Sequence, residues 1–267
     1  KKNINKINLK NIDYDILGTG YEEVIKDLMT GKVLGQFFTQ PIIKNIMIEL
    51  INPKLNPDGK IESMCDPTMG TGGFLITYIK NILKQSVEKK IDLNWNNIKS
   101  SIYGKEIEPD TYQLAISNML ISTGHMFDVL EKGDSIRDPI TKKYDIILAN
   151  PPFGIDGLNY LEIKHELKNE YLPIKSNSSV PLFLQAIIYM LKINGRCAVI
   201  VPEGVLFTES SIHQGTRKHL ITNYNLKKVK ELKKDTINID IIQKKELLPA
   251  LFFVLSRKQC ENYASKV

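Results

Sequence analysis

The sequence contains few of the residues that form disulfide bonds or bind metal ions. It has three cysteines and four histidines, and neither a CxxC nor an HxxxH spacing occurs among them. Cys65, Cys197 and Cys260 are odd in number and far apart, which is typical of a reducing cytoplasm rather than of an oxidised framework. We therefore expect a cytoplasmic protein that binds no metal ion.

Long apolar runs are also missing. The best candidate, Val180 to Leu191, contains Gln185 and stops at Lys192, so it falls short of the roughly 18 residues of a membrane helix. The N-terminal residues carry positive charge without the apolar core of a signal peptide, and the chain does not begin with methionine. We therefore expect no membrane association and an internal part of a longer polypeptide.

The remaining composition is ordinary for a folded protein. Hydrophobic residues make up 42% of the chain, and 36 Lys+Arg against 30 Asp+Glu give a formal net charge of +6. These values exclude collagen, a disordered acidic tail and a disulfide scaffold. The length of 267 residues predicts one large α/β domain, alone or with a smaller appendage. The basic surplus allows a polyanionic partner, but a lysine-rich solvated surface explains it equally well.

Short apolar runs alternate with longer amphipathic segments over residues 59–267. The predicted strands are Ile61 to Cys65, Ser101 to Lys105, Asp128 to Lys132, Tyr144 to Ala149, Cys197 to Val201, Leu226 to Glu231 and Ala250 to Leu255. The predicted helices are Gly73 to Leu83, Thr111 to Ser122, Pro181 to Leu191 and Gly215 to Thr222. This alternation predicts a doubly wound, mostly parallel sheet of seven strands. Residues 1–58 are predicted to form a small N-terminal helical segment, with helices near Tyr21 to Met29 and from Pro41.

Ligands of such sheets bind outside the carboxyl ends of the strands, so the turns that follow the strands are the first places to look for function. The first such turn runs from Asp66 to Gly73, between a predicted strand and a predicted helix. Its glycines allow the backbone to approach a ligand closely, and Asp66 suits hydroxyl or amino groups better than phosphates. The spacing does not match the dinucleotide fingerprint, and a purely structural glycine-rich turn is an equally good interpretation.

Acidic residues follow the next two predicted strands. Glu106 comes about 40 residues after Asp66 and is placed to accept hydrogen bonds from both ribose hydroxyls of a nucleoside. Asp134, in the turn Gly133-Asp134-Ser135, is a candidate acceptor for an adenine amino group. A helix-capping or exposed glutamate and an ordinary Asp-Ser turn are the alternative interpretations of these two positions.

The turn after the fourth predicted strand is the most informative. It reads Asn150-Pro151-Pro152-Phe153, and two successive prolines fix φ and push the preceding asparagine into an extended conformation. The stiff loop presents the Asn150 side-chain carbonyl and the Pro151 backbone carbonyl as two convergent acceptors, which suit an exocyclic amine. Phe153 offers a ring on which a flipped base can stack. A proline-stiffened structural loop is the alternative.

These residues resemble S-adenosylmethionine-dependent N6-adenine DNA methyltransferases, and their order resembles the modification subunits of type I restriction-modification systems. Further segments carry the resemblance: Asp15 to Glu22, Gly35-Gln36-Phe37-Phe38-Thr39, Phe183 to Gln185, Leu191 to Arg196 and Val201 to Phe207. The similarity extends from about Tyr14 to Arg217.

The resemblance implies a Rossmann-like methyltransferase fold that transfers a methyl group from S-adenosylmethionine to N6 of adenine in double-stranded DNA. Residues 59–267 would form the catalytic domain, and residues 1–58 would contain the first cofactor motif. The implied catalytic residues are Asn150, Pro151, Pro152 and Phe153. The implied cofactor-binding residues are Gln36, Phe37, Phe38, Thr39, Asp66, Thr68, Met69, Gly70, Thr71, Gly72, Glu106 and Asp134.

The resemblance also implies partners. Type I systems combine two modification subunits with a specificity subunit and a restriction subunit, and we see no recognition domain in this sequence. Methylation of RNA adenine or of a protein glutamine is an alternative, because the Asn-Pro-Pro-Phe loop suits any planar amine. A catalytically idle scaffold that binds DNA or a partner subunit is another. The segment from Gly154 to Ser179 has little regular pattern and is a candidate substrate-side loop.

Overall fold

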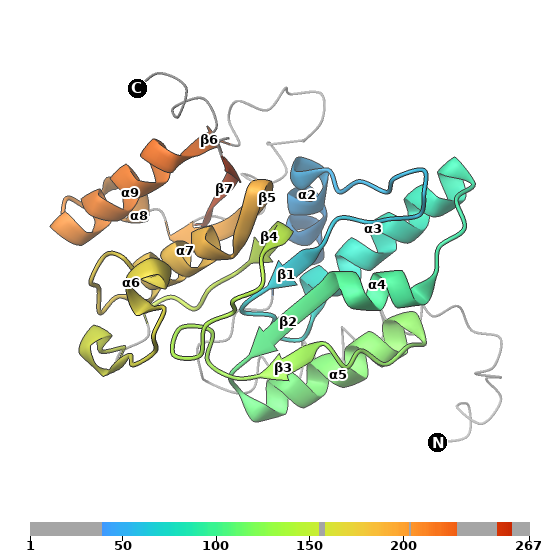
Figure 1. Ribbon diagram of the computed structural model, residues 1–267, viewed down its shortest axis with the longest axis horizontal. Helices are drawn as coiled ribbons and strands as arrows, with labels where there is room; N and C mark the ends of the chain where they lie inside the picture. The colour runs from blue at the N-terminus through green and yellow to red at the C-terminus, as the bar shows by residue number, and fades with distance from the viewer. Residues whose placement is uncertain (1–38, 155–157, 203, 229–249, 258–267) are drawn as a thin grey trace.

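The computed structural model describes residues 39–154, 158–202, 204–228 and 250–257. A single sheet crosses the molecule, with helices on both of its faces (Figure 1). Its strands are β1 (Met64–Asp66), β2 (Ile102–Glu106), β3 (Leu130–Lys132), β4 (Tyr144–Ala149), β5 (Leu191–Pro202), β6 (Tyr224–Lys228) and β7 (Ala250–Arg257). The helices are α2 (Pro41–Ile51), α3 (Gly73–Lys89), α4 (Trp95–Ser101), α5 (Pro109–Thr123), α6 (Lys168–Tyr171), α7 (Ser179–Met190), α8 (Gly204–Phe207) and α9 (Ser211–Asn223), with a 3-10 turn, η3, at Tyr160–Glu162.

The order of the strands is β3-β2-β1-β4-β5-β7-β6. The neighbours from β3 to β5 pair in parallel, whereas β7 is antiparallel to both β5 and β6. The predicted mostly parallel α/β fold is confirmed. The chain builds the sheet outward from β1 to β3 and then crosses to β4 on the other side of β1. The carboxyl ends of β1 and β4 therefore flank a topological switch point, where sheets of this kind bind ligands.

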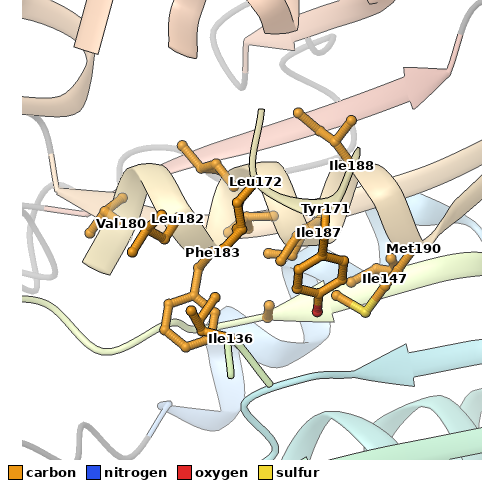
Figure 2. Close-up of a cluster of buried hydrophobic side chains, with 14 of the residues drawn as sticks. Ile136, Ile147, Tyr171, Leu172, Val180, Leu182, Phe183, Ile187, Ile188 and Met190 are labelled. Atoms are coloured by element: carbon orange, nitrogen blue, oxygen red, sulfur yellow. The ribbon is translucent and has the colours of Figure 1, made fainter. Parts of the chain in front are cut away.

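Alternate side chains of each central strand enter two separate hydrophobic clusters. In β4, Ile146 and Leu148 pack with α2, α3 and α5, whereas Ile147 and Ala149 pack with α6 and α7. Figure 2 shows Ile147 beneath the apolar side chains of α7. A strand that is buried on both faces reads as a continuous apolar run, and for this reason β4 has the bounds that the sequence predicts.

Other element bounds differ from the prediction for identifiable reasons. The first strand is Met64–Asp66 rather than Ile61 to Cys65, because Ile61 forms an isolated bridge with Leu55. Helix α3 continues beyond Leu83 to Lys89, over residues whose side chains are mostly polar. Helix α4 was not predicted, since Ile98 is its only buried residue and gives no periodic signal.

The segment expected to be an irregular substrate-side loop has more structure than its sequence suggests. Within its described part, it contains η3 and α6. Tyr160, Ile163, Tyr171 and Leu172 are buried in the same cluster as α7, as Figure 2 shows for Tyr171 and Leu172. Their irregular spacing explains why no helix or strand pattern was visible.

Some predictions fall on residues that the structure does not describe. The helix near Tyr21 to Met29 and residues Gln36, Phe37 and Phe38 lie outside the described ranges, as do the last residues of the strand predicted at Leu226 to Glu231. None of the helices within the described ranges combines the length and the apolar character needed to cross a lipid bilayer.

Candidate active site

The turn after β1 lies close to strand β2, and glycines occur on both sides of this contact. Gly70 and Gly72 have φ values of 53° and 80°, which L side chains rarely adopt. Gly104 of β2 lies against the same turn, and an added Cβ there would be 2.5 Å from the Met69 sulfur. The Met69 N–H donates to the Lys105 carbonyl at 3.0 Å, which ties the turn to β2. The backbone at Gly70 has open space, because an added Cβ would meet nothing within 4 Å.

Asp66, at the end of β1, is completely buried. Its Oδ1 accepts a hydrogen bond from the Thr68 N–H at 3.0 Å. Its Oδ2 is buried and accepts no hydrogen bond from the residues that the structure describes. Burial raises the pKa of Asp66 from 3.8 to about 8, against the opposing effect of the Thr68 hydrogen bond. Without a further donor or a cation at Oδ2, this carboxyl group therefore favours its protonated form near neutral pH.

Glu106, at the end of β2, connects the first two turns. Its Oε2 accepts from the Gly70 N–H at 3.0 Å, and its Oε1 accepts from the Glu108 N–H at 2.9 Å. Burial raises the pKa of Glu106, and these backbone donors oppose the rise. A carboxylate has about four lone-pair sites, so Glu106 keeps acceptor capacity beyond its backbone donors. The next residue, Ile107, is 59% exposed and places an apolar surface beside the carboxylate.

Asp134 follows β3 and has partners within its own turn. Its Oδ1 accepts from the backbone N–H groups of Ile136 and Arg137, and its Oδ2 pairs with the Arg137 guanidinium at 2.8 Å. The adjacent Ser135 hydroxyl donates to the Pro67 carbonyl at 2.6 Å, so the third turn is joined to the first. The role of Asp134 toward an adenine amino group remains a prediction.

The loop after β4 meets a residue from the beginning of the described chain. The Asn150 side-chain NH2 donates to the Thr39 hydroxyl at 3.1 Å. This contact joins the end of the Gly-Gln-Phe-Phe-Thr segment to the Asn-Pro-Pro-Phe loop across 111 positions of sequence. Phe153 is half-buried and packs against both hydrophobic clusters. The Pro152 carbonyl accepts from the Ser179 hydroxyl at 3.0 Å.

Two polar residues that sequence reasoning missed support the glycine-rich turn. Asn118 of α5 is completely buried, and its side chain donates to the Thr71 carbonyl at 2.9 Å. Lys44 of α2 is 3% exposed, and its Nζ would lie 3.0 Å from a Cβ added at Gly73. No sequence pattern identifies either residue, because each is one of several polar residues in its helix and neither directly follows a strand. Ile107 had a weak signal, being an apolar residue directly after an acidic one.

The four turns together form one edge of polar groups at the switch point. These groups suit a nucleoside with a cationic substituent. They comprise a buried acidic oxygen, a second carboxylate with spare acceptor capacity, open glycine backbone and an exposed isoleucine. The Asn-Pro-Pro-Phe loop beside them offers carbonyl acceptors and an aromatic ring. Within the described residues, no group of three or more His, Cys, Asp and Glu side chains is placed to hold a metal ion.

Known proteins are similar to this chain in sequence and in fold. The chain is 30% identical over 244 residues to the type I restriction enzyme EcoEI methylase subunit of Escherichia coli, which covers 88% of this chain and 47% of that protein. It is also 30% identical over 246 residues to the HindI methylase subunit of Haemophilus influenzae, covering 90% and 48%. The chain thus spans about half the length of these relatives.

Solved structures of low sequence identity have the same fold. The type I restriction-modification methyltransferase subunit from Streptococcus thermophilus superposes with a TM-score of 0.71 at 19% identity, over 97% of this chain and 53% of that one. A putative class I S-adenosylmethionine-dependent methyltransferase from Listeria monocytogenes gives a TM-score of 0.67 at 17% identity, over 96% and 72%. The family model described as N-6 DNA Methylase matches residues 12–246. The chain therefore belongs to the N-6 DNA methylase family.

Proposed function

We propose that this chain is the catalytic core of a DNA methyltransferase that transfers a methyl group from S-adenosylmethionine to N6 of adenine, as part of the modification subunit of a type I restriction-modification system. The observation that carries the proposal is the hydrogen bond between Asn150 and Thr39. This contact joins Thr39 to the loop to which we assign amine binding, and that loop follows β4, the neighbour of the strand that carries Asp66. Family membership and the similarity to type I methylase subunits support it.

The chain's own residues fit this cofactor. The Asp66 carboxylate suits the α-ammonium group, because a nearby cation removes the need for a proton on the buried Oδ2. Glu106 has acceptor capacity for ribose hydroxyls, and Ile107 offers an apolar face for adenine. Asp134 is assigned to the adenine amino group. The open backbone of the glycine-rich turn completes this part of the site, and the residues assigned to it are Thr68, Met69, Gly70, Thr71 and Gly72. The methionine part is assigned to Gln36, Phe37, Phe38 and Thr39.

The Asn150 amide is oriented by its contact with Thr39. Because its NH2 donates to the Thr39 hydroxyl, its carbonyl oxygen points in another direction and is placed to accept from a substrate amine. Pro151 supplies a second carbonyl, and the two proline rings keep the loop stiff. Phe153 provides the stacking face. When bound, S-adenosylmethionine supplies an electrophilic methyl group on its sulfonium. The residues around it therefore act mainly by positioning the amine in line with that group. Such positioning can lower the activation free energy by roughly 7–11 kcal/mol.

The partners follow from the same proposal. We assign double-stranded DNA as substrate, a separate specificity subunit to read the sequence, a restriction subunit, and two copies of this chain in the assembly. Similarity to the type I methylase subunits supports the assignment. We place the protein in the cytoplasm, away from the membrane, which agrees with the free thiols of the buried Cys65 and Cys197. Residues 1–58 and 59–267 are proposed as the N-terminal segment and the catalytic domain.

The test is methyl transfer from labelled S-adenosylmethionine to unmodified DNA, by the complete polypeptide with its specificity subunit. We expect N6-methyladenine, detected by mass spectrometry of the digested DNA, and no label on RNA or on a glutamine peptide. Asn150→Ala should abolish transfer and leave the cofactor dissociation constant within about twofold, because Asn150 faces the amine. Asn97→Ala, on the exposed side of α4, serves as the matched control. Cofactor binding without transfer to any substrate would instead indicate an idle scaffold.

A further inference from the structure

Two consecutive residues of the Asn-Pro-Pro-Phe loop cannot donate backbone hydrogen bonds. Pro151 and Pro152 have no backbone N–H, so the loop can be held there only through carbonyls and side chains. The proline rings fix φ at both positions, and the peptide planes are rigid. The ψ angles of the two prolines are therefore the soft dihedrals that remain. The ψ of Pro152 determines where the Phe153 backbone, and with it the ring, is placed.

Ser179 acts on this remaining dihedral. Its hydroxyl donates to the Pro152 carbonyl at 3.0 Å, and the orientation of that carbonyl is set by ψ of Pro152. Ser179 is itself 2% exposed, so water has little access to compete for the bond. If the loop turns away, the buried Ser179 hydroxyl loses its acceptor. The unsatisfied hydroxyl raises the free energy of the displaced loop.

The element that carries Ser179 is rigidly packed. Every residue of α7 except Tyr189 is buried, and Figure 2 shows its apolar side chains packed over Ile147 and Tyr171. The first turn of the helix, where Ser179 lies, is therefore fixed relative to the sheet that carries Asn150. A donor on this helix holds a loop in one position, whereas a donor on an exposed turn would move with it.

The chain that leads into α7 is anchored as well. The Gln185 amide, 1% exposed, accepts from the Ile174 N–H at 2.6 Å and donates to the Ile174 carbonyl at 3.1 Å. It also donates to the Pro181 carbonyl at 3.0 Å, so one side chain joins the helix to the preceding segment. The Ser176 hydroxyl donates to the Ser178 carbonyl at 3.2 Å. Ser179 thus has fixed backbone on both sides.

We propose that Ser179 is a positioning residue for methyl transfer, whose hydroxyl fixes the Pro152 carbonyl and thereby places the Phe153 ring for the base that carries the target amine. The role rests on the function proposed above, because it requires that the loop bind the amine. Ser179 acts through the loop and is not assigned a contact with substrate or cofactor.

The proposal predicts a specific kinetic pattern for Ser179→Ala in the complete protein with its specificity subunit. Displacement of a reacting group by about 1 Å can lower a rate by about a hundredfold, so we expect the single-turnover rate to fall by about tenfold to a hundredfold. The cofactor dissociation constant should stay within about twofold. Ser179→Thr keeps the hydroxyl and should restore most of the rate. Ser86→Ala is the matched control, since it removes a serine-to-carbonyl bond of 2.7 Å, to Ile91 after α3, away from the loop.

A second measurement does not depend on activity. Hydrogen exchange of the Phe153 and Gly154 amides should be faster in Ser179→Ala than in wild type and in Ser86→Ala. An unchanged rate of methyl transfer or an unchanged exchange rate in Ser179→Ala overturns the proposal, as does an equal loss of rate and of cofactor affinity. Wild-type protein that transfers no methyl group contradicts the proposed function instead, and exchange at the two amides still decides whether Ser179 holds the loop.

Discussion

The buried carboxyl group of Asp66 should make the ligand-free protein less stable as pH rises. Burial raises its pKa from 3.8 in the unfolded chain to about 8 in the folded protein. The folded state therefore binds the proton more tightly than the unfolded state does. The stability that protonated Asp66 contributes is fully present below about pH 4 and is lost progressively as pH rises through about 8. Asp66→Asn replaces the titrating acid with a neutral amide of the same shape and should remove this dependence.

The size of the effect follows from the change in pKa. Each pKa unit corresponds to about 1.4 kcal/mol, so full ionisation of Asp66 costs about 6 kcal/mol of folding free energy. Between about pH 5.5 and pH 8.5 the stability of Asp66→Asn relative to wild type should increase by about 3 kcal/mol. The buried amide NH2 has a cost of its own, but that cost is the same at both pH values and does not contribute to the difference.

Urea denaturation of wild type and variant at the two pH values measures the difference directly. Asp145→Asn is the control of opposite character. Burial raises the pKa of Asp145, but hydrogen bonds from Lys192 and Ser63 outweigh burial and lower it below the ordinary value. Asp145 is therefore ionised throughout the range, and Asp145→Asn should be destabilised equally at both pH values. If the difference in unfolding free energy between wild type and Asp66→Asn is the same at both pH values, the argument is refuted that Asp66 is buried without a cationic partner among the residues that the structure describes.

Three further predictions concern the cofactor site, the glycine-rich turn and sequence specificity. Glu106→Gln replaces an acceptor with a donor and should weaken S-adenosylmethionine binding by about 1–3 kcal/mol in calorimetry, whereas Glu88→Gln, at an exposed position, should not. Equal affinities of the two variants would exclude the ribose assignment. Gly104→Ala places a Cβ 2.5 Å from the Met69 sulfur and should destabilise by about 1–3 kcal/mol in urea, whereas Gly215→Ala meets nothing closer than 3.8 Å and should not destabilise. Without a specificity subunit, the full-length protein should methylate plasmid DNA weakly and at no defined site, and efficient methylation of a single motif would contradict the type I assignment.

The strands that can be predicted from this sequence are those buried on both faces. Tyr144 to Ala149 has apolar residues at nearly every position, so the run, its length and its flanking residues define β4 without other information. Helix α4 has one buried side chain, so no apolar periodicity marks it, and the Asn94 cap at its start does not by itself distinguish a helix from a turn. Between Leu158 and Leu172 the buried residues are irregularly spaced, and they pack in the same cluster as α7. Sequence periodicity reports burial only where one element provides several consecutive contacts.

The same distinction separates the predictable part of the site from the rest. Asp66, Glu106, Asp134 and Asn150 could be selected as candidates because each follows a predicted strand, and the carboxyl ends of parallel strands lie at one edge of the sheet. Their contacts with elements outside the sheet could not be predicted in this way. The contact of Asn150 with Thr39 spans 111 positions, and that of Pro152 with Ser179 spans 27, and both depend on where helices pack. A serine before an apolar helix is expected as a cap, and only the packing of α7 against β4 shows that the Ser179 hydroxyl faces the Pro152 carbonyl. Residues that we assign to the reacting groups can thus be selected from strand order, whereas residues that we expect to position them require the tertiary structure.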